Sequence, residues 1–114
     1  MNEVKLMMTI RQYAKTEQGK WLNDYDWDNV PVVVITKLPG DIAGMYSCGY
    51  IVLLDGDESI IAPIYLHELR HRWQWQKQRF KYLLGKLYRP LIEKDAYARQ
   101  AEFEEWQRGI ENVN

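Results

Sequence analysis

The chain has 114 residues, of which 46% are hydrophobic and 27% are charged, and its formal net charge is −1. This length suits one domain, so we expect residues 1–114 to form a single domain, and the near-zero charge argues against a dedicated binder of nucleic acid or another polyanion. The only cysteine, Cys48, excludes an intrachain disulfide, and the sequence shows neither a secretory signal nor a membrane span, so it is typical of a soluble cytoplasmic protein.

The first half of the chain predicts one helix and two or more strands. Residues 3–15 have an imperfect apolar stripe at helical spacing, and residues 19–29 are rich in turn-forming residues and predict a loop. Residues 30–36 are short and β-branched and predict a strand, with Pro31 near its start. Residues 44–54 predict a second strand or a hairpin.

The second half predicts two helices. The first runs from about residue 59 to 84, with Pro63 in its first turn and Gly85 as its stop. The second runs from about residue 90 to 108. The order of elements therefore predicts an α+β fold, with a small antiparallel or mixed sheet packed on the two helices.

The stretch "YLHELRHRWQWQ" contains both histidines of the chain, His67 and His71, with Glu68 beside the first. At about 100° per residue, the two imidazoles share one face of the first long helix. The opposite face carries the predicted apolar stripe, which consists of Leu66, Leu69, Trp73, Phe80 and Leu84.

Two histidines four residues apart can bind one tetrahedral metal ion, and an adjacent carboxylate can accept a proton from a bound water. The pattern HExxH also occurs by chance, in which case it is only a solvated helix face. The strand-then-helix context, and the use of both histidines here, favour the metal site.

A zinc site of this kind needs a third protein ligand. On the following helix, Glu93 borders a predicted buried stripe formed by Ile92, Ala96, Phe103 and Ile110, whereas Asp95 and Glu102 fall on the wrong side. A helix-terminal carboxylate that interacts with the helix dipole is the alternative reading of Glu93. That reading does not explain why the acid borders the core.

At these residues the chain resembles the zincin metallopeptidases of the gluzincin kind, in a minimal single-domain form. Those proteins place a glutamate ligand on the helix after HExxH, commonly in an E-x-(E/D)-A-D run, and residues 93–97 here read EKDAY. The resemblance covers roughly residues 30–105. It implies a zincin-like domain in which His67, His71 and Glu93 bind zinc and Glu68 is the general base and acid.

One position departs from the pattern, because Tyr97 replaces the family's final aspartate, which often steadies a ligand histidine. The Tyr97 hydroxyl is expected to take over that task, to donate to a substrate oxyanion, or only to pack. The resemblance also implies an edge strand along one rim of the cleft, which we place in residues 44–54, with Tyr46, Trp75 and Tyr97 as candidates to line a pocket. Cys48 is expected to be a buried, inert thiol rather than a zinc ligand.

The expected function is that of a zinc-dependent peptidase that acts on a peptide or protein substrate, as a monomer or small homo-oligomer with no membrane partner. A catalytically inactive, zinc-stabilised binding module is the first alternative. The second is a nucleic-acid-associated module that uses the seven basic residues between positions 69 and 92. The acidic residues of the last helix offer a simpler reading, in which the two helices have complementary charge.

Overall fold

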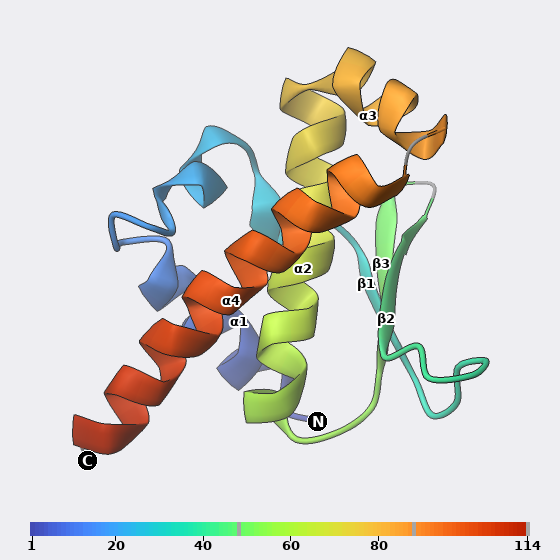
Figure 1. Ribbon diagram of the computed structural model, residues 1–114. Helices are drawn as coiled ribbons and strands as arrows, with labels where there is room; N and C mark the ends of the chain where they lie inside the picture. The colour runs from blue at the N-terminus through green and yellow to red at the C-terminus, as the bar shows by residue number, and fades with distance from the viewer. Residues whose placement is uncertain (48, 88, 114) are drawn as a thin grey trace.

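The computed structural model describes residues 1–47, 49–87 and 89–113, and it confirms the predicted α+β fold (Figure 1). The elements in chain order are α1 (Glu3–Tyr13), the short 3₁₀ helices η1 (Lys20–Asp24) and η2 (Trp27–Asn29), β1 (Val32–Ile35), β2 (Gly44–Ser47), β3 (Tyr50–Leu54), α2 (Glu58–Lys77), α3 (Arg79–Leu87) and α4 (Arg89–Val113). The predicted loop at residues 19–29 is thus two single 3₁₀ turns.

The three strands form one mixed sheet in the order β1-β3-β2. The central strand β3 pairs in parallel with β1, with Val32 opposite Ile51, and antiparallel with β2, with Gly44 opposite Leu53. The predicted hairpin is confirmed, and the φ of 86° at Gly49 explains the glycine in its turn. Because β2 pairs on one side only, the expected edge strand is also confirmed.

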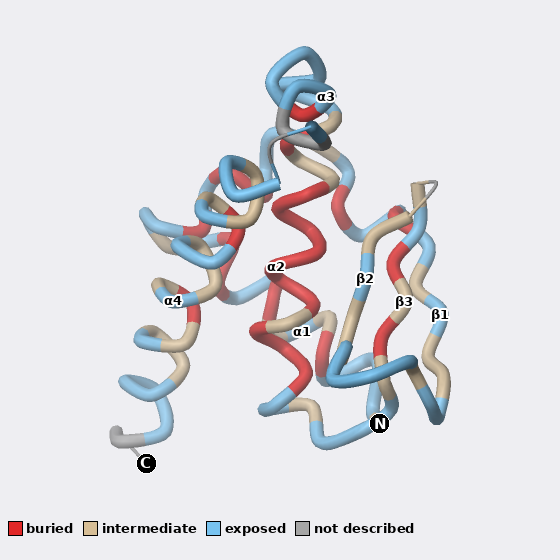
Figure 2. The backbone as a smooth tube through the Cα atoms, turned by 45° about the vertical axis from the view of Figure 1, so that its right-hand side comes forward, coloured by how far each residue is buried: buried red, intermediate tan, exposed pale blue. Residues whose placement is uncertain are grey.

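Helix α2 lies between the sheet on one side and helices α1 and α4 on the other (Figures 1 and 2). Asp57 caps its start by accepting a hydrogen bond from the Ser59 backbone N–H at 2.9 Å. The sequence predicted an amphipathic helix with the histidines on the face away from the core. Instead, most residues of the segment 61–71 are buried, since α4 and β2 cover the histidine face as well.

The long helix ends earlier than predicted, which corrects the role given to Gly85. Gln78 has φ −135° and ψ 44°, so α2 stops at Lys77, and Gly85 lies inside the separate helix α3. Phe80 and Leu84 were predicted to continue the buried stripe. Both are exposed, because the break at Gln78 turns α3 away from the core.

Pro63 lies in the second turn of α2 rather than in the first. A proline there has no N–H to donate to the carbonyl oxygen four residues earlier, which belongs to Ser59. The side-chain amide of Gln107 on α4 donates to this oxygen at 3.0 Å. The far end of α4 is therefore tied to the start of α2.

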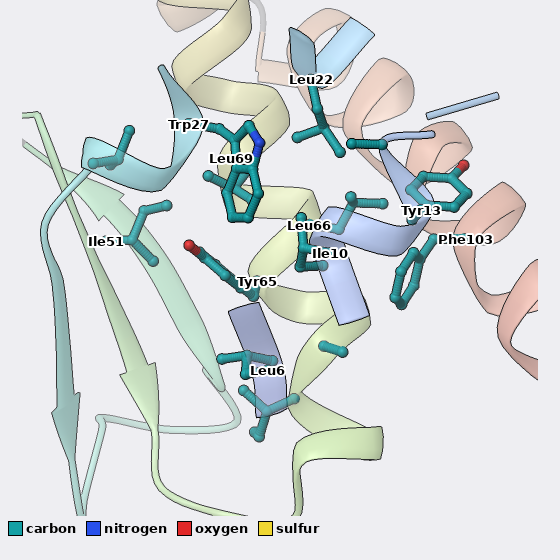
Figure 3. Packing of buried hydrophobic residues seen from close by; sticks show 14 of the residues in the cluster. Leu6, Ile10, Tyr13, Leu22, Trp27, Ile51, Tyr65, Leu66, Leu69 and Phe103 are labelled. Carbon is teal, nitrogen blue, oxygen red and sulfur yellow. The ribbon is translucent and has the colours of Figure 1, made fainter. Parts of the chain in front are cut away.

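The hydrophobic core gathers side chains from α1, η1, η2, β3, α2 and α4 (Figure 3). Tyr13 of α1 meets Phe103 of α4 edge to face, with ring centroids 4.9 Å apart. Ala96 and Phe103 are fully buried, as predicted, but Ile110 is exposed because α4 has by then passed the body of the domain. Within the described residues, no helix is long and apolar enough to span a bilayer.

Candidate metal centre

His67 and His71 project from successive turns of α2, and their ring centroids lie 4.9 Å apart. Each residue is only 6% exposed. Helix α4 and strand β2 bury them, and Gly44 permits this, because a Cβ at Gly44 would lie 2.7 Å from the Ile64 side chain of α2. The two imidazoles therefore form a close pair that is shielded from bulk water.

Glu93, near the start of α4, meets both imidazoles with one carboxylate. Its Oε2 lies 3.2 Å from His67 Nε2, and its Oε1 lies 2.9 Å from His71 Nε2. Helix α4 runs back across α2, and buried Ala96 lets the two helices approach closely (Figure 1). The structure thus brings together His67, His71 and Glu93, three residues that sequence reasoning had grouped.

Two glutamines hold the other nitrogen of each imidazole. Gln100 Oε1 lies 3.0 Å from His67 Nδ1, and Gln74 Oε1 lies 2.9 Å from His71 Nδ1. An amide oxygen only accepts, so each Nδ1 must carry the proton. The sequence analysis missed both glutamines, although the spacing of three between His71 and Gln74 was a usable signal.

The orientation of each glutamine amide follows from the acceptors that its nitrogen faces. Gln100 Nε2 donates to Glu104 Oε1 at 2.9 Å. Gln74 Nε2 donates to the Ile92 carbonyl oxygen at 3.0 Å and to Asp95 Oδ2 at 2.9 Å. Since nitrogen must face these acceptors, oxygen must face the histidines. In the neutral form of each histidine, the histidine Nε2 atom is therefore the unprotonated one, and its lone pair faces Glu93.

This convergence of lone pairs needs a positive charge between them. Two imidazole nitrogens and a carboxylate that face one another repel unless a cation lies among them. Burial, followed by the neighbouring His71, lowers the pKa of His67, so a proton on His67 is a poor source of that charge. A metal ion fits the donor set, since imidazole nitrogen and carboxylate oxygen are the ligands that zinc takes in proteins.

Glu68 belongs to the same cluster. Its carboxylate and the nitrogens of His67 and His71 lie within 4.8 Å of one another, a grouping that could hold a metal ion. The Tyr46 backbone hydrogen-bonds to this carboxylate, and burial, followed by the charge of Glu93, raises the pKa of Glu68 to about 8. Both Glu68 and Glu93 are therefore candidate metal-binding carboxylates. Among the described residues, Glu93 is the one in contact with the Nε2 atoms of both histidines.

Tyr97 lies on α4 one turn after Glu93, with its ring 4.5 Å from the His67 ring, centroid to centroid. Both nitrogens of His67 and both of His71 already have other partners. Gln74 and Gln100, rather than the Tyr97 hydroxyl, therefore steady the histidines. Tyr97 is 60% exposed and lines the space in front of the cluster.

A cavity of about 1340 Å³ opens in front of the histidines, between β2 and the start of α4. Tyr46, Trp75 and Tyr97, the three aromatic residues expected at a pocket, all line it, and Arg72 and Arg89 add positive charge. Arg72 donates to the Tyr46 hydroxyl at 3.1 Å. Residues 41–47, which include the edge strand β2, line one side of the cavity.

Asp95, which the helical projection placed on the wrong side of α4 for a ligand, forms a two-point ion pair with Arg70 at 2.7 and 3.2 Å and reaches His71 only through Gln74. The Arg70 guanidinium also lies over the rings of Trp21 and Trp73, at 4.9 and 3.7 Å from their centroids. Arg70, one of the basic residues between positions 69 and 92, thus pairs with an acidic residue of α4. This agrees with the interpretation that the two helices have complementary charge. Cys48, the other candidate ligand considered, lies outside the described residues.

No protein-family model, curated protein or solved structure matches this chain. The His67, Glu68 and His71 group on α2, with the HExxH spacing, is a candidate metal site on its own geometry.

Proposed function

We propose that this protein is a zinc-dependent peptidase whose zinc ligands are His67, His71 and Glu93. The observation that carries the proposal is the approach of both histidine Nε2 atoms to the single Glu93 carboxylate, with a glutamine oxygen against each Nδ1. Three protein ligands leave one position of a tetrahedral zinc open, which is the arrangement of catalytic zinc sites. The resemblance to the gluzincins at the same residues supports this choice.

Glu68 serves as general base and acid in this proposal. When bound, zinc lowers the pKa of a water molecule and polarises a peptide carbonyl. Glu68 lies beside both histidines and is shielded from solvent, so its carboxylate would be close enough to a zinc-bound water to accept a proton and return it. It would take a proton from the attacking water and pass it to the leaving amine.

In this proposal the substrate binds in the cavity in front of the histidines. The edge strand β2 borders the cavity, and an unpaired strand edge can bind an extended peptide as an added strand. In this proposal Tyr97, exposed beside His67, donates a hydrogen bond from its hydroxyl to the oxyanion that develops on the attacked carbonyl. Affinity from main-chain hydrogen bonds predicts weak sequence preference, with an apolar side chain favoured by Tyr46 and Trp75.

Metal analysis and proteolysis of the wild type beside Glu68→Gln test the proposal. The wild type should carry one zinc per chain and cleave an unfolded protein such as casein. Glu68→Gln should keep the zinc and the fold, while the cleavage rate falls by about 10² to 10⁴. Glu105→Gln, which removes an exposed carboxylate on α4, should behave as the wild type.

A protein without bound zinc under zinc-replete conditions would contradict the proposal. Bound zinc with no cleavage of any unfolded substrate would identify a zinc-stabilised binding module instead. A Glu68→Gln variant as active as the wild type would remove Glu68 from the mechanism.

A further inference from the structure

Helix α3 presents an apolar face that nothing else in the described chain covers. It follows the end of α2, at the end of the molecule opposite the two chain termini (Figure 1). Phe80 and Leu87 are 76% and 79% exposed, and Leu83 and Leu84 are also exposed. At 3.6 residues per turn these four side chains fall within an arc of about 100°. They form one stripe, which we call the α3 apolar face.

The opposite side of α3 is the one that packs on the domain. Tyr82 is buried, and its ring lies 5.7 Å from the Trp75 ring of α2, centroid to centroid. The orientation of α3 is therefore set by this contact, and the α3 apolar face points outward as a consequence. Figure 2 shows the outer side of α3 as exposed.

Positive charge flanks the α3 apolar face. Arg79 and Lys81 lie on its two sides, each about 100° from Phe80 around the helix, and the Arg79 guanidinium lies over the Trp75 ring, 4.6 Å from its centroid. Lys77 precedes them at the end of α2, and all three residues are exposed. The sequence contains no acidic residue from position 69 to 92. In a chain of net charge −1, this is a local concentration of positive charge around an apolar stripe.

We propose that the α3 apolar face binds the surface of an anionic lipid bilayer, with α3 lying in the plane of the interface. An apolar stripe flanked by Lys and Arg is the pattern of helices that insert their apolar side among headgroups while their cations meet lipid phosphates and carboxylates. A nucleic acid fits less well, because leucine side chains do not stack on bases as aromatic rings do. A second copy of the same face would bring like charges together.

Vesicle flotation at 100 mM NaCl tests this inference, which is independent of the zinc site. The vesicles contain either phosphatidylcholine alone or phosphatidylcholine with about one third phosphatidylserine. The wild type should float with the anionic vesicles and not with the neutral ones. Lys77→Gln with Lys81→Gln should weaken the binding roughly 30-fold, since each basic residue near such a surface contributes about fivefold.

A second pair of substitutions tests the apolar part. Phe80→Ser with Leu87→Ser should weaken binding at least about tenfold, because both side chains lose the area that they bury among lipid chains. Val4→Ser with Ile60→Ser is the matched control, since Val4 and Ile60 are similarly exposed, at 70% and 67%, on other helices. Lys15→Gln with Lys94→Gln is the control for charge.

Binding that is lost in both α3 variants and kept in both controls supports the inference, with unchanged circular dichroism as the check on folding. A wild type that ignores anionic vesicles overturns it. So does a wild type that binds both kinds of vesicle equally, or α3 variants that bind as the wild type does. Self-association that depends on Phe80 and Leu87, without vesicle binding, would show that a second copy covers the face and would also overturn it.

Discussion

Replacing Gln100 with leucine should weaken zinc binding without removing any ligand. In the wild type, Gln100 Oε1 accepts from His67 Nδ1 at 3.0 Å and so keeps the proton away from Nε2. Leucine is similar in size, but its side chain cannot accept a hydrogen bond. The His67 proton would then move to Nε2. From there the N–H would donate a hydrogen bond to the Glu93 carboxylate, which lies 3.2 Å away.

The size of the effect follows from the hydrogen bond that zinc must then displace. A hydrogen bond between a neutral donor and a charged acceptor contributes about 1.5–3 kcal/mol, and each 1.4 kcal/mol is a factor of ten. The dissociation constant for zinc should therefore rise between about tenfold and 150-fold. This agrees with the 10- to 100-fold loss that is typical when a partner behind a metal-binding histidine is removed.

Zinc titration against a competing chelator measures the affinity, and ¹⁵N NMR of the metal-free imidazoles reports which nitrogen is protonated. Glu104→Ala is the control, because it removes only the acceptor for the Gln100 amide nitrogen and leaves the Gln100 oxygen against His67. It should change the affinity by less than about threefold. If Gln100→Leu keeps both the wild-type affinity and the Nδ1–H tautomer, the reasoning about the glutamines is wrong.

Three further outcomes are expected. Glu93→Ala should lose zinc and lower the melting temperature of the zinc-loaded protein, as shown by metal analysis and calorimetry, and unchanged zinc affinity would mean that the third ligand is misassigned. In metal-free protein, the pKa of Glu68 is raised from 4.5 to about 8, so the folded state holds an extra proton between these values, and stability falls as pH rises, by at most about 1.4 kcal/mol per unit. Urea unfolding at pH 6 and 8 should show this slope in the wild type and a smaller one in Glu68→Gln, and equal slopes would contradict the raised pKa. Gly19→Ala should destabilise the fold by about 1–3 kcal/mol in urea unfolding, because the new methyl group would overlap the Tyr13 carbonyl oxygen, and an unchanged midpoint would show that the loop shifts freely.

The sequence was sufficient for the parts of the site that depend on one helix. Helical spacing alone put His67 and His71 on one face, and the same reasoning on α4 selected Glu93 over Asp95. Both results depend only on the rotation per residue. The position of β2 at a sheet edge beside the histidines was expected from the family resemblance rather than from spacing.

What the sequence missed depends on contacts between elements. The break at Gln78 involves neither glycine nor proline, so nothing local marked it, whereas Gly85 gave a false stop signal inside α3. The histidine face of α2 was placed opposite the core because of its polar residues. It is nevertheless buried, because α4 and β2 close over it, and residue spacing within one helix does not reveal such contacts. Gln100 lies two turns beyond Glu93, and its contact with His67 becomes evident only once the position of α4 against α2 is known.

The division of the proposed zinc ligands between α2 and α4 has a consequence for how fast a bound metal can exchange. Backbone amides of α2 between residues 61 and 71 are buried in the middle of the domain and should exchange hydrogen only when the whole domain unfolds. Glu93 sits close to the start of α4, next to α3, whose Tyr82 packs against Trp75 and whose apolar face is in solvent. This end of the chain can open as a smaller unit. We therefore expect the rate of zinc release to follow the local opening of α3 and the start of α4, and to be far faster than global unfolding.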